Sequence, residues 1–149
     1  MKTRSWWALW TALCLTSALD ASADWKVLLD SKSLEAPVYK DGFGWYGGSQ
    51  SVPAVYKDKL RIEIRTKDDE QAFDVYGFTP GLGDDQPVMT RKAVKAELDK
   101  DGNKTGWYVV SEEVTIGPRP QERMHFKFFA KRRGSFVVSI FKEEKAEEK

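Results

Sequence analysis

Cysteine is nearly absent from this sequence: Cys14 is the only one among 149 residues. It lies inside an apolar segment near the N-terminus and outside the part that has the composition of a folded domain. Once that segment is removed, the chain can form no disulfide and no thiolate metal site. A domain of this kind must be stabilised by its hydrophobic core.

A charge excess of one sign is also lacking, because 24 basic residues are balanced by 23 acidic ones. The first 23 residues contain Lys2, Arg4 and Asp20, so the remaining 126 residues carry 22 charges of each sign. Nucleic-acid binding depends on a strong basic excess. The balance therefore predicts a protein that does not bind nucleic acid.

Long apolar runs are missing too, since the longest, from Trp6 to Leu19, is too short to span a membrane. Two basic residues precede this run, and Ala21-Ser22-Ala23 supplies the small residues that signal peptidase requires. We therefore predict a signal peptide over residues 1–23, cleaved before Asp24. The mature chain is expected to contain no transmembrane segment and to be exported, to a periplasm or to the extracellular space.

Catalytic and metal signatures are equally scarce. A Ser-His-Asp or Cys-His site would have to use His125, the single histidine, which stands in a mixed strand pattern and is expected at the surface. Asp99, Asp101 and Asn103 have the alternating spacing of calcium ligands, but Lys104 stands where that pattern needs glycine. We therefore assign no catalytic residue, no metal and no cofactor.

Acidic neighbours leave one enzymatic possibility open, a hydrolase that uses two carboxylates. The candidate pairs are Asp68 with Asp69, Asp84 with Asp85, and Glu112 with Glu113. Adjacent residues on a strand point to opposite faces, so a working pair would have to come from different segments. Solvated turn charges explain these residues more simply.

Alternating apolar residues indicate short strands throughout the mature chain. The clearest case is Leu60, Ile62 and Ile64, which alternate with charged residues. No repeat and no long helical period occurs, and about seven to nine such strands can be counted. The pattern predicts an all-β fold, an antiparallel sandwich or jelly roll, formed by one domain over residues 24–142 and followed by a charged tail over 143–149.

Two β-hairpins are predicted along the second half of the chain. Between 123 and 142, a loop Arg132-Arg133-Gly134 with left-handed Gly134 would place four pairs on one face, apolar in all but one residue: Ala130 with Phe136, Phe128 with Val138, Phe126 with Ile140 and Met124 with Lys142. The other, mixed face would carry Lys127, Phe129 and His125. Between 88 and 110, Asp101-Gly102 favours a two-residue turn that sets Ala96 opposite Trp107 and Val94 opposite Val109.

A glycine-rich stretch from Pro37 to Pro53 is expected to be a loop, or a loop interrupted by a short strand. It contains four aromatic residues, and three of them, Phe43, Trp45 and Tyr46, are the candidate ligand-binding residues. Flat aromatic surfaces near polar groups often hold sugars and apolar peptides. Alternatively, these rings fold back and close one end of the sandwich.

The order of elements resembles that of galactose-binding-like jelly-roll carbohydrate-binding modules. The segments concerned are WKVLLDSKSL, the aromatic loop, VYKDKLRIEI, and WYVVSEEVTIG with the later MHFKFFAKRRGSFVVSIF. The resemblance covers most of the mature chain, as layout only, and implies the fold more than the ligand. Such modules often carry an acidic residue in the final strand, and FVVSIF has none.

These observations favour an exported, non-catalytic module that binds a glycan or a protein of the envelope or extracellular matrix. One alternative is a carboxylate-dependent polysaccharide hydrolase. Another is a structural subunit that docks through the mixed face of the C-terminal hairpin.

Overall fold

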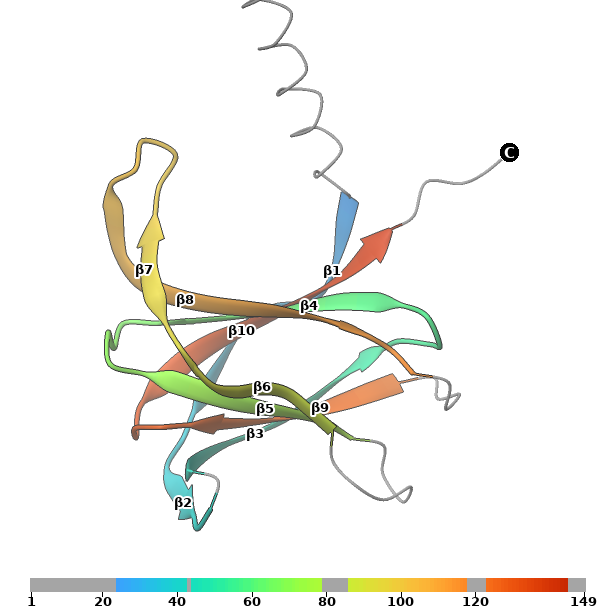
Figure 1. The fold of residues 1–149 in the computed structure, drawn as a ribbon, viewed down its shortest axis with the longest axis horizontal. Coiled ribbons are helices and arrows are strands. Elements are labelled where there is room, and N and C mark those ends of the chain that lie inside the picture. Colours follow the sequence, from blue (N-terminus) through green and yellow to red (C-terminus); the bar gives the residue numbers. More distant parts are fainter. Residues whose placement is uncertain (1–23, 43, 79–85, 118–122, 145–149) are drawn as a thin grey trace, which may run out of the picture.

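The computed structural model describes residues 24–42, 44–78, 86–117 and 123–144. This part of the chain contains no helix that could span a bilayer. Ten strands form it (Figure 1): β1 (Asp24–Glu35), β2 (Val38–Lys40), β3 (Gly44–Pro53), β4 (Lys59–Thr66), β5 (Ala72–Phe78), β6 (Gln86–Ala93), β7 (Lys95–Leu98), β8 (Lys104–Thr115), β9 (Arg123–Ala130) and β10 (Ser135–Glu144).

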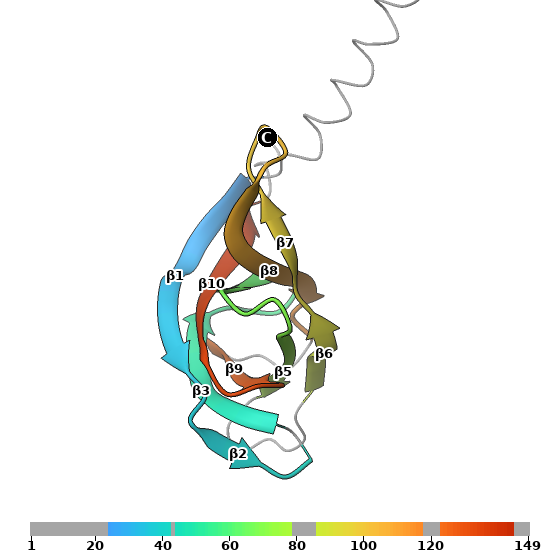
Figure 2. The ribbon, with the colours of Figure 1, turned by 90° about the vertical axis from the view of Figure 1, so that its left-hand side faces the viewer.

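The strands form two five-stranded antiparallel sheets, in the orders β1-β10-β4-β8-β7 and β2-β3-β9-β5-β6. Without the edge strands β2 and β7, this is the strand order of a jelly roll. Figure 2 shows the two layers wrapped around a common interior. The predicted all-β sandwich is therefore confirmed. The proposed signal peptide lies outside the described residues, and the first residues of the expected tail, Glu143 and Glu144, continue β10.

The core lies between the two sheets, and β4 shows how the sequence builds it. Leu60, Ile62 and Ile64 are fully buried, as their alternation with charged residues predicted. Burying one such side chain contributes about 1.5–3 kcal/mol. The opposite sheet contributes Phe126 and Phe128, which are also fully buried.

The C-terminal hairpin prediction is wrong, because β9 and β10 belong to different sheets. β9 pairs with β3 and β5, whereas β10 pairs with β1 and β4. The apolar residues predicted to face the core do so, with Met124 partly buried, but Phe128 and Val138 meet it from opposite layers. Lys142 lies outside the core and pairs with Asp58 at 3.7 Å. Alternation identifies the buried face of a strand and leaves its partner open. The mixed face of that hairpin is consequently divided between the two outer surfaces of the sandwich.

The connection between β9 and β10, residues 131–134, is an arch that crosses from one sheet to the other. Its backbone bonds to neighbouring segments: the Lys131 amide donates to the Ala72 carbonyl, and the Gly134 carbonyl accepts from the Ala36 amide. Gly134 is not among the glycines with positive φ, so the left-handed turn predicted there is absent. The hairpin turn had been the only reason to expect that conformation.

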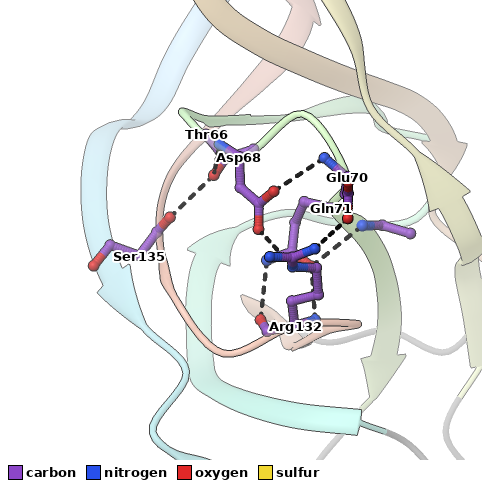
Figure 3. Close-up of polar contacts among 7 residues, drawn as sticks. Thr66, Asp68, Glu70, Gln71, Arg132 and Ser135 are labelled. Atoms are coloured by element: carbon purple, nitrogen blue, oxygen red, sulfur yellow. Dashed lines mark hydrogen bonds and ion pairs between the residues drawn. The ribbon is translucent and has the colours of Figure 1, made fainter.

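The side chain of Gln71 secures this arch from inside (Figure 3). It is 1% exposed, its Nε2 donates to the Arg132 carbonyl at 2.9 Å, and its Oε1 accepts from the Arg132 amide at 2.9 Å. Arg132 also pairs through its guanidinium with Asp68 at 3.1 Å and with Glu70. Both backbone groups of one arch residue are therefore satisfied by a single buried amide.

The second predicted hairpin exists between β7 and β8, with a longer loop than expected. The Asp99 amide donates to the Asn103 carbonyl at 2.8 Å, which leaves a three-residue loop with Gly102 at φ +85°. A register shift between Ala96 and Leu98 then places Ala96 opposite Tyr108 and not Trp107. Val94, predicted opposite Val109, instead lies between β6 and β7, where its amide bonds to the Gln71 carbonyl.

The glycine-rich stretch is more regular than predicted, since most of it forms β2 and β3, which pair with each other. Glycine is required at two points for different reasons. Gly44 has a φ of +114° beside the turn. Gly47 is buried, and a Cβ there would overlap the Phe136 ring, whose Cε1 would lie 2.9 Å away.

Candidate functional site

The outer face of the sheet β2-β3-β9-β5-β6 carries a regular array of aromatic and polar side chains. Strand register places them in rows that cross the strands. One row joins Tyr46, Phe129 and Asp74; a second joins Ser49, Lys127 and Tyr76; and a third joins Ser51, His125 and Phe78. We call these nine residues the outer-face array.

Aromatic rings in the array are close enough to form one surface across three strands. The ring centroids of Tyr46 and Phe129 are 5.3 Å apart, and those of Phe129 and Tyr76 are 5.8 Å apart. In the third row, the ring centroids of Phe78 and His125 lie 5.3 Å apart, with the ring planes tilted by 40°. Phe129 is 7% exposed, whereas the tyrosines beside it are half-buried, so Phe129 supports rings that solvent reaches.

A cleft of about 460 Å³ continues the array toward the start of β3. We call it the tyrosine cleft; its lining includes Tyr39, Gly42, Gly44, Asp74, Arg91 and Lys131. Tyr39 is 56% exposed and supplies an aromatic wall. Three charged side chains stand around it, so the cleft combines a ring with donors and an acceptor, the composition of a specific small-ligand site.

Local backbone geometry explains how the cleft forms. Gly42 and Gly44 have φ values of +85° and +114°, which allow the chain to turn tightly between β2 and β3. On the other side, Arg91 has a φ of 43°, and its amide donates to the Asp74 carboxylate. Asp74 is 8% exposed and is held by this bond, so one oxygen is already committed to the backbone.

The predicted ligand-binding residues are separated by this arrangement. Phe43 lies outside the described residues. Trp45 and Tyr46 are neighbours on one strand and point to opposite faces. Trp45 packs against the core, and its ring and that of Tyr39 form an edge-to-face pair with centroids 5.6 Å apart. The Arg133 guanidinium lies 6.0 Å from the centroid of the Trp45 ring. Tyr46 is the member of the trio that stands in the outer-face array.

Several residues of the array could not be selected from sequence. Strand alternation predicts Phe129 on a mixed face, but with partners from β10, whereas its partners lie on β3 and β5. Tyr76 and Asp74 carried no signal apart from strand alternation. Tyr39 was visible as an aromatic residue in the glycine-rich stretch, and only the β2–β3 turn shows that it faces a cleft.

The carboxylates that might support hydrolysis are distributed differently. Of the described residues lining the tyrosine cleft, Asp74 is the one acidic residue. Glu113 pairs with Lys59 at 3.0 Å, and Glu112 pairs with Lys92. Asp84 and Asp85 lie outside the described residues. The described chain also contains no group of three or more acidic, histidine or cysteine side chains that could hold a metal ion.

A carboxyl group with a perturbed pKa lies on the other sheet. The Arg65 guanidinium donates to Glu97 through two hydrogen bonds of 2.8 Å and holds the pKa of that carboxyl below its usual value. The same guanidinium lies 4.5 Å from the Trp107 ring. This ion pair is structural support for β4 and β7, since it is remote from the outer-face array.

Comparison with known proteins gives no family model that matches the chain and no match among curated proteins. Similar solved structures include CBM27-1 of Caldicellulosiruptor saccharolyticus, solved with mannohexaose (12% identity, 83% of this chain, 84% of that chain, TM-score 0.48). They also include the C-terminal CBM6 of LamC from Zobellia galactanivorans (13% identity, 81% of this chain, 100% of that chain, TM-score 0.40). A third is CBM6cm-2 of lichenase 5A from Cellvibrio mixtus (12% identity, 84% of this chain, 88% of that chain, TM-score 0.40). The chain is similar to these carbohydrate-binding modules in fold alone, and the jelly-roll layout expected from the sequence is confirmed by the strand order of its own two sheets.

Proposed function

We propose that this protein is an exported, non-catalytic module that binds a glycan on the outer-face array and the adjoining tyrosine cleft. The observation that supports the proposal most directly is the contact of Tyr46 and Tyr76 with Phe129, which joins three rings across the first two rows of the array. The C–H faces of a sugar ring pack on such a surface, and polar groups beside it fix the orientation of the hydroxyls. Asp74, Ser49 and the cations of the cleft supply those groups.

The binding role is favoured over hydrolysis by the acid content of the cleft. Glycosidases need two carboxyl groups, separated by about 5–9.5 Å, on the two sides of the scissile bond. Asp74 has no acidic companion among the described residues that line the cleft. Its bond from the Arg91 amide also favours an acceptor role.

A protein ligand of the envelope or matrix is the second candidate for the same surface. Its support is the exposed apolar edge at β2, where Val38 is 51% exposed beside the array. A protein partner would cover this edge as well as the rings. The two candidates are separated by testing purified glycans that lack any protein.

The experiment compares Tyr46→Ala and Tyr76→Ala with Tyr56→Ala. Tyr56 is 50% exposed in the turn between β3 and β4, so the Tyr56→Ala variant removes a similar ring from a position outside the array. Titration against a panel of neutral glycans, followed by tryptophan fluorescence or calorimetry, should show at least about tenfold weaker binding for the first two variants only. Equal affinities for all three variants, or no binding to any glycan by the unaltered protein, would reject this site.

Trp45 is measured in the same way, because it was a candidate ligand-binding residue. Its packing against the core predicts that Trp45→Ala lowers the melting temperature, whereas Tyr46→Ala changes it little. Export is tested separately by N-terminal sequencing of the protein recovered outside the cytoplasm. The expected first residue is Asp24, and a product that retains Trp6 would contradict the proposed signal peptide.

A further inference from the structure

A second cleft, of about 510 Å³, lies beside the arch that joins β9 to β10. We call it the arch cleft; its lining includes Ser33 in β1, Thr66 at the end of β4 with Lys67 and Asp68 directly after it, Trp107 near the start of β8, and Arg133 in the arch. These residues come from four separated parts of the sequence, so the cleft exists only in the folded chain. It shares no lining residue with the tyrosine cleft.

The charges in this cleft are not balanced. The Lys67 ammonium lies 4.4 Å from the Trp107 ring centroid, and the Arg133 guanidinium lies 6.0 Å from that of Trp45. Neither cation has a carboxylate partner among the described residues. The acidic residue of the lining, Asp68, is already paired with Arg132 at 3.1 Å. Lys67 and Arg133 both line the cleft, so two positive charges stand there without a counter-charge from the part of the chain that the structure describes.

The cleft is held open by the polar network drawn in Figure 3. Thr66 donates its hydroxyl to the Ser135 carbonyl at 3.2 Å, and Gln71 binds both backbone groups of Arg132. The ion pair between Asp68 and Arg132 closes the same network. These bonds fix the backbone beside the cleft, so less conformational entropy has to be lost when a ligand binds.

We infer that the arch cleft binds a sugar residue that carries an acidic group, a carboxylate or a sulfate. The ring of Trp107 supplies an apolar wall for the sugar, and Lys67 and Arg133 supply charge-assisted hydrogen bonds to the acidic group. Arg65 also contacts Trp107, but its charge is taken by Glu97. The site goes beyond the proposed function, because it lies apart from the outer-face array and selects a different class of sugar.

The test is affinity electrophoresis of the full mature chain in gels that contain polygalacturonate, dextran sulfate or unsubstituted mannan. Retardation by polygalacturonate identifies a carboxylate ligand, and retardation by dextran sulfate alone identifies a sulfate ligand. The double variant Lys67→Gln, Arg133→Gln should bind the acidic polymer at least about tenfold more weakly. The single variant Lys67→Gln should show a smaller loss and the same melting curve as the unaltered protein.

A matched control removes two other exposed cations, Lys26 in β1 and Lys100 in the β7–β8 loop, through Lys26→Gln and Lys100→Gln. We expect this control to stay within about twofold of the unaltered protein, because general attraction falls only slightly. An equal loss in the control, equal competition by duplex DNA, or no retardation by either acidic polymer would overturn the inference. Mannan binding by the double variant Lys67→Gln, Arg133→Gln should be unchanged. A negative result at the arch cleft therefore does not affect the test of glycan binding at the outer-face array.

Discussion

Gln71 offers a sharp test of how the β9–β10 arch is held, because its buried side-chain amide forms hydrogen bonds with both backbone groups of Arg132. The sequence alone does not predict this arch. The Gln71 Nε2 donates to the Arg132 carbonyl and its Oε1 accepts from the Arg132 amide, both at 2.9 Å. Gln71→Met keeps the length of the side chain and removes both bonds, together with the bond that Oε1 accepts from the Ala72 amide at 3.2 Å. Each bond contributes about 1 kcal/mol net, and each backbone group left without a partner costs up to about 1–3 kcal/mol more.

Part of that cost is recovered, because the Arg132 bonds are only partly buried and water can reach the backbone. We therefore expect Gln71→Met to lower the free energy of unfolding by about 2–4 kcal/mol. A domain of this size has about 5–15 kcal/mol in total, so the loss is a large share. Gln71→Ala should cost more, since it adds a cavity at a side chain that is 1% exposed.

The neighbouring Glu70 provides the control, because its carboxylate pairs with the guanidinium of the same Arg132 from an exposed position. Exposed ion pairs contribute about 0–1 kcal/mol, so Glu70→Ala should change stability little. Urea unfolding measures both variants, with the slope of free energy against urea checked for constancy. If Gln71→Met and Glu70→Ala have the same midpoint, the amide does not hold the arch.

Three further predictions concern stability. Phe128→Ala should cost about 3–5 kcal/mol in urea melts and Lys127→Ala under about 1 kcal/mol, because the first side chain is fully buried and the second is on the outer surface; equal losses would contradict the assigned faces. Gly47→Ala should cost about 1–3 kcal/mol through overlap with a buried ring, whereas Gly117→Ala, with open space around it, should be near neutral by thermal melt. Glu97→Gln should flatten the acid limb of the stability profile: the pKa of Glu97 is lowered from 4.5, so its ion pair stabilises the fold above that pH and is lost as the pH falls through the lowered pKa. Identical profiles for the unaltered protein and Glu97→Gln between about pH 2 and 5 would contradict this assignment.

The fold class could be predicted because strand alternation is a local property. Leu60, Ile62 and Ile64 specify a buried face whichever strands lie beside β4, and the sandwich follows when most segments show the same pattern. Partner choice is not local in this sense. In β9 and β10, two apolar faces separated by a short glycine-containing connection fit a hairpin and an arch equally well.

The difference between a hairpin and an arch is decided by the backbone groups of the connection. In a hairpin, the two strands satisfy each other across the turn. In this arch, Lys131 bonds to Ala72 and Gly134 to Ala36, which are 59 and 98 residues away in the sequence. A single sequence contains no signal for bonds of that range, so the connection could be recognised only in three dimensions.

The candidate site shows the same limit at the level of single side chains. Composition drew attention to the glycine-rich aromatic stretch, and the tyrosine cleft does lie beside it, at Gly42 and Gly44. Yet Trp45 and Tyr46 were assigned a common role because they are adjacent in a segment that was expected to be a loop. Once that segment is a strand, adjacency separates the two rings. The aromatic surface is instead formed by the register of the strands, which brings Tyr46 beside Phe129 and Phe129 beside Tyr76. Its sequence signal is therefore a set of aromatic residues at alternate positions of three distant strands.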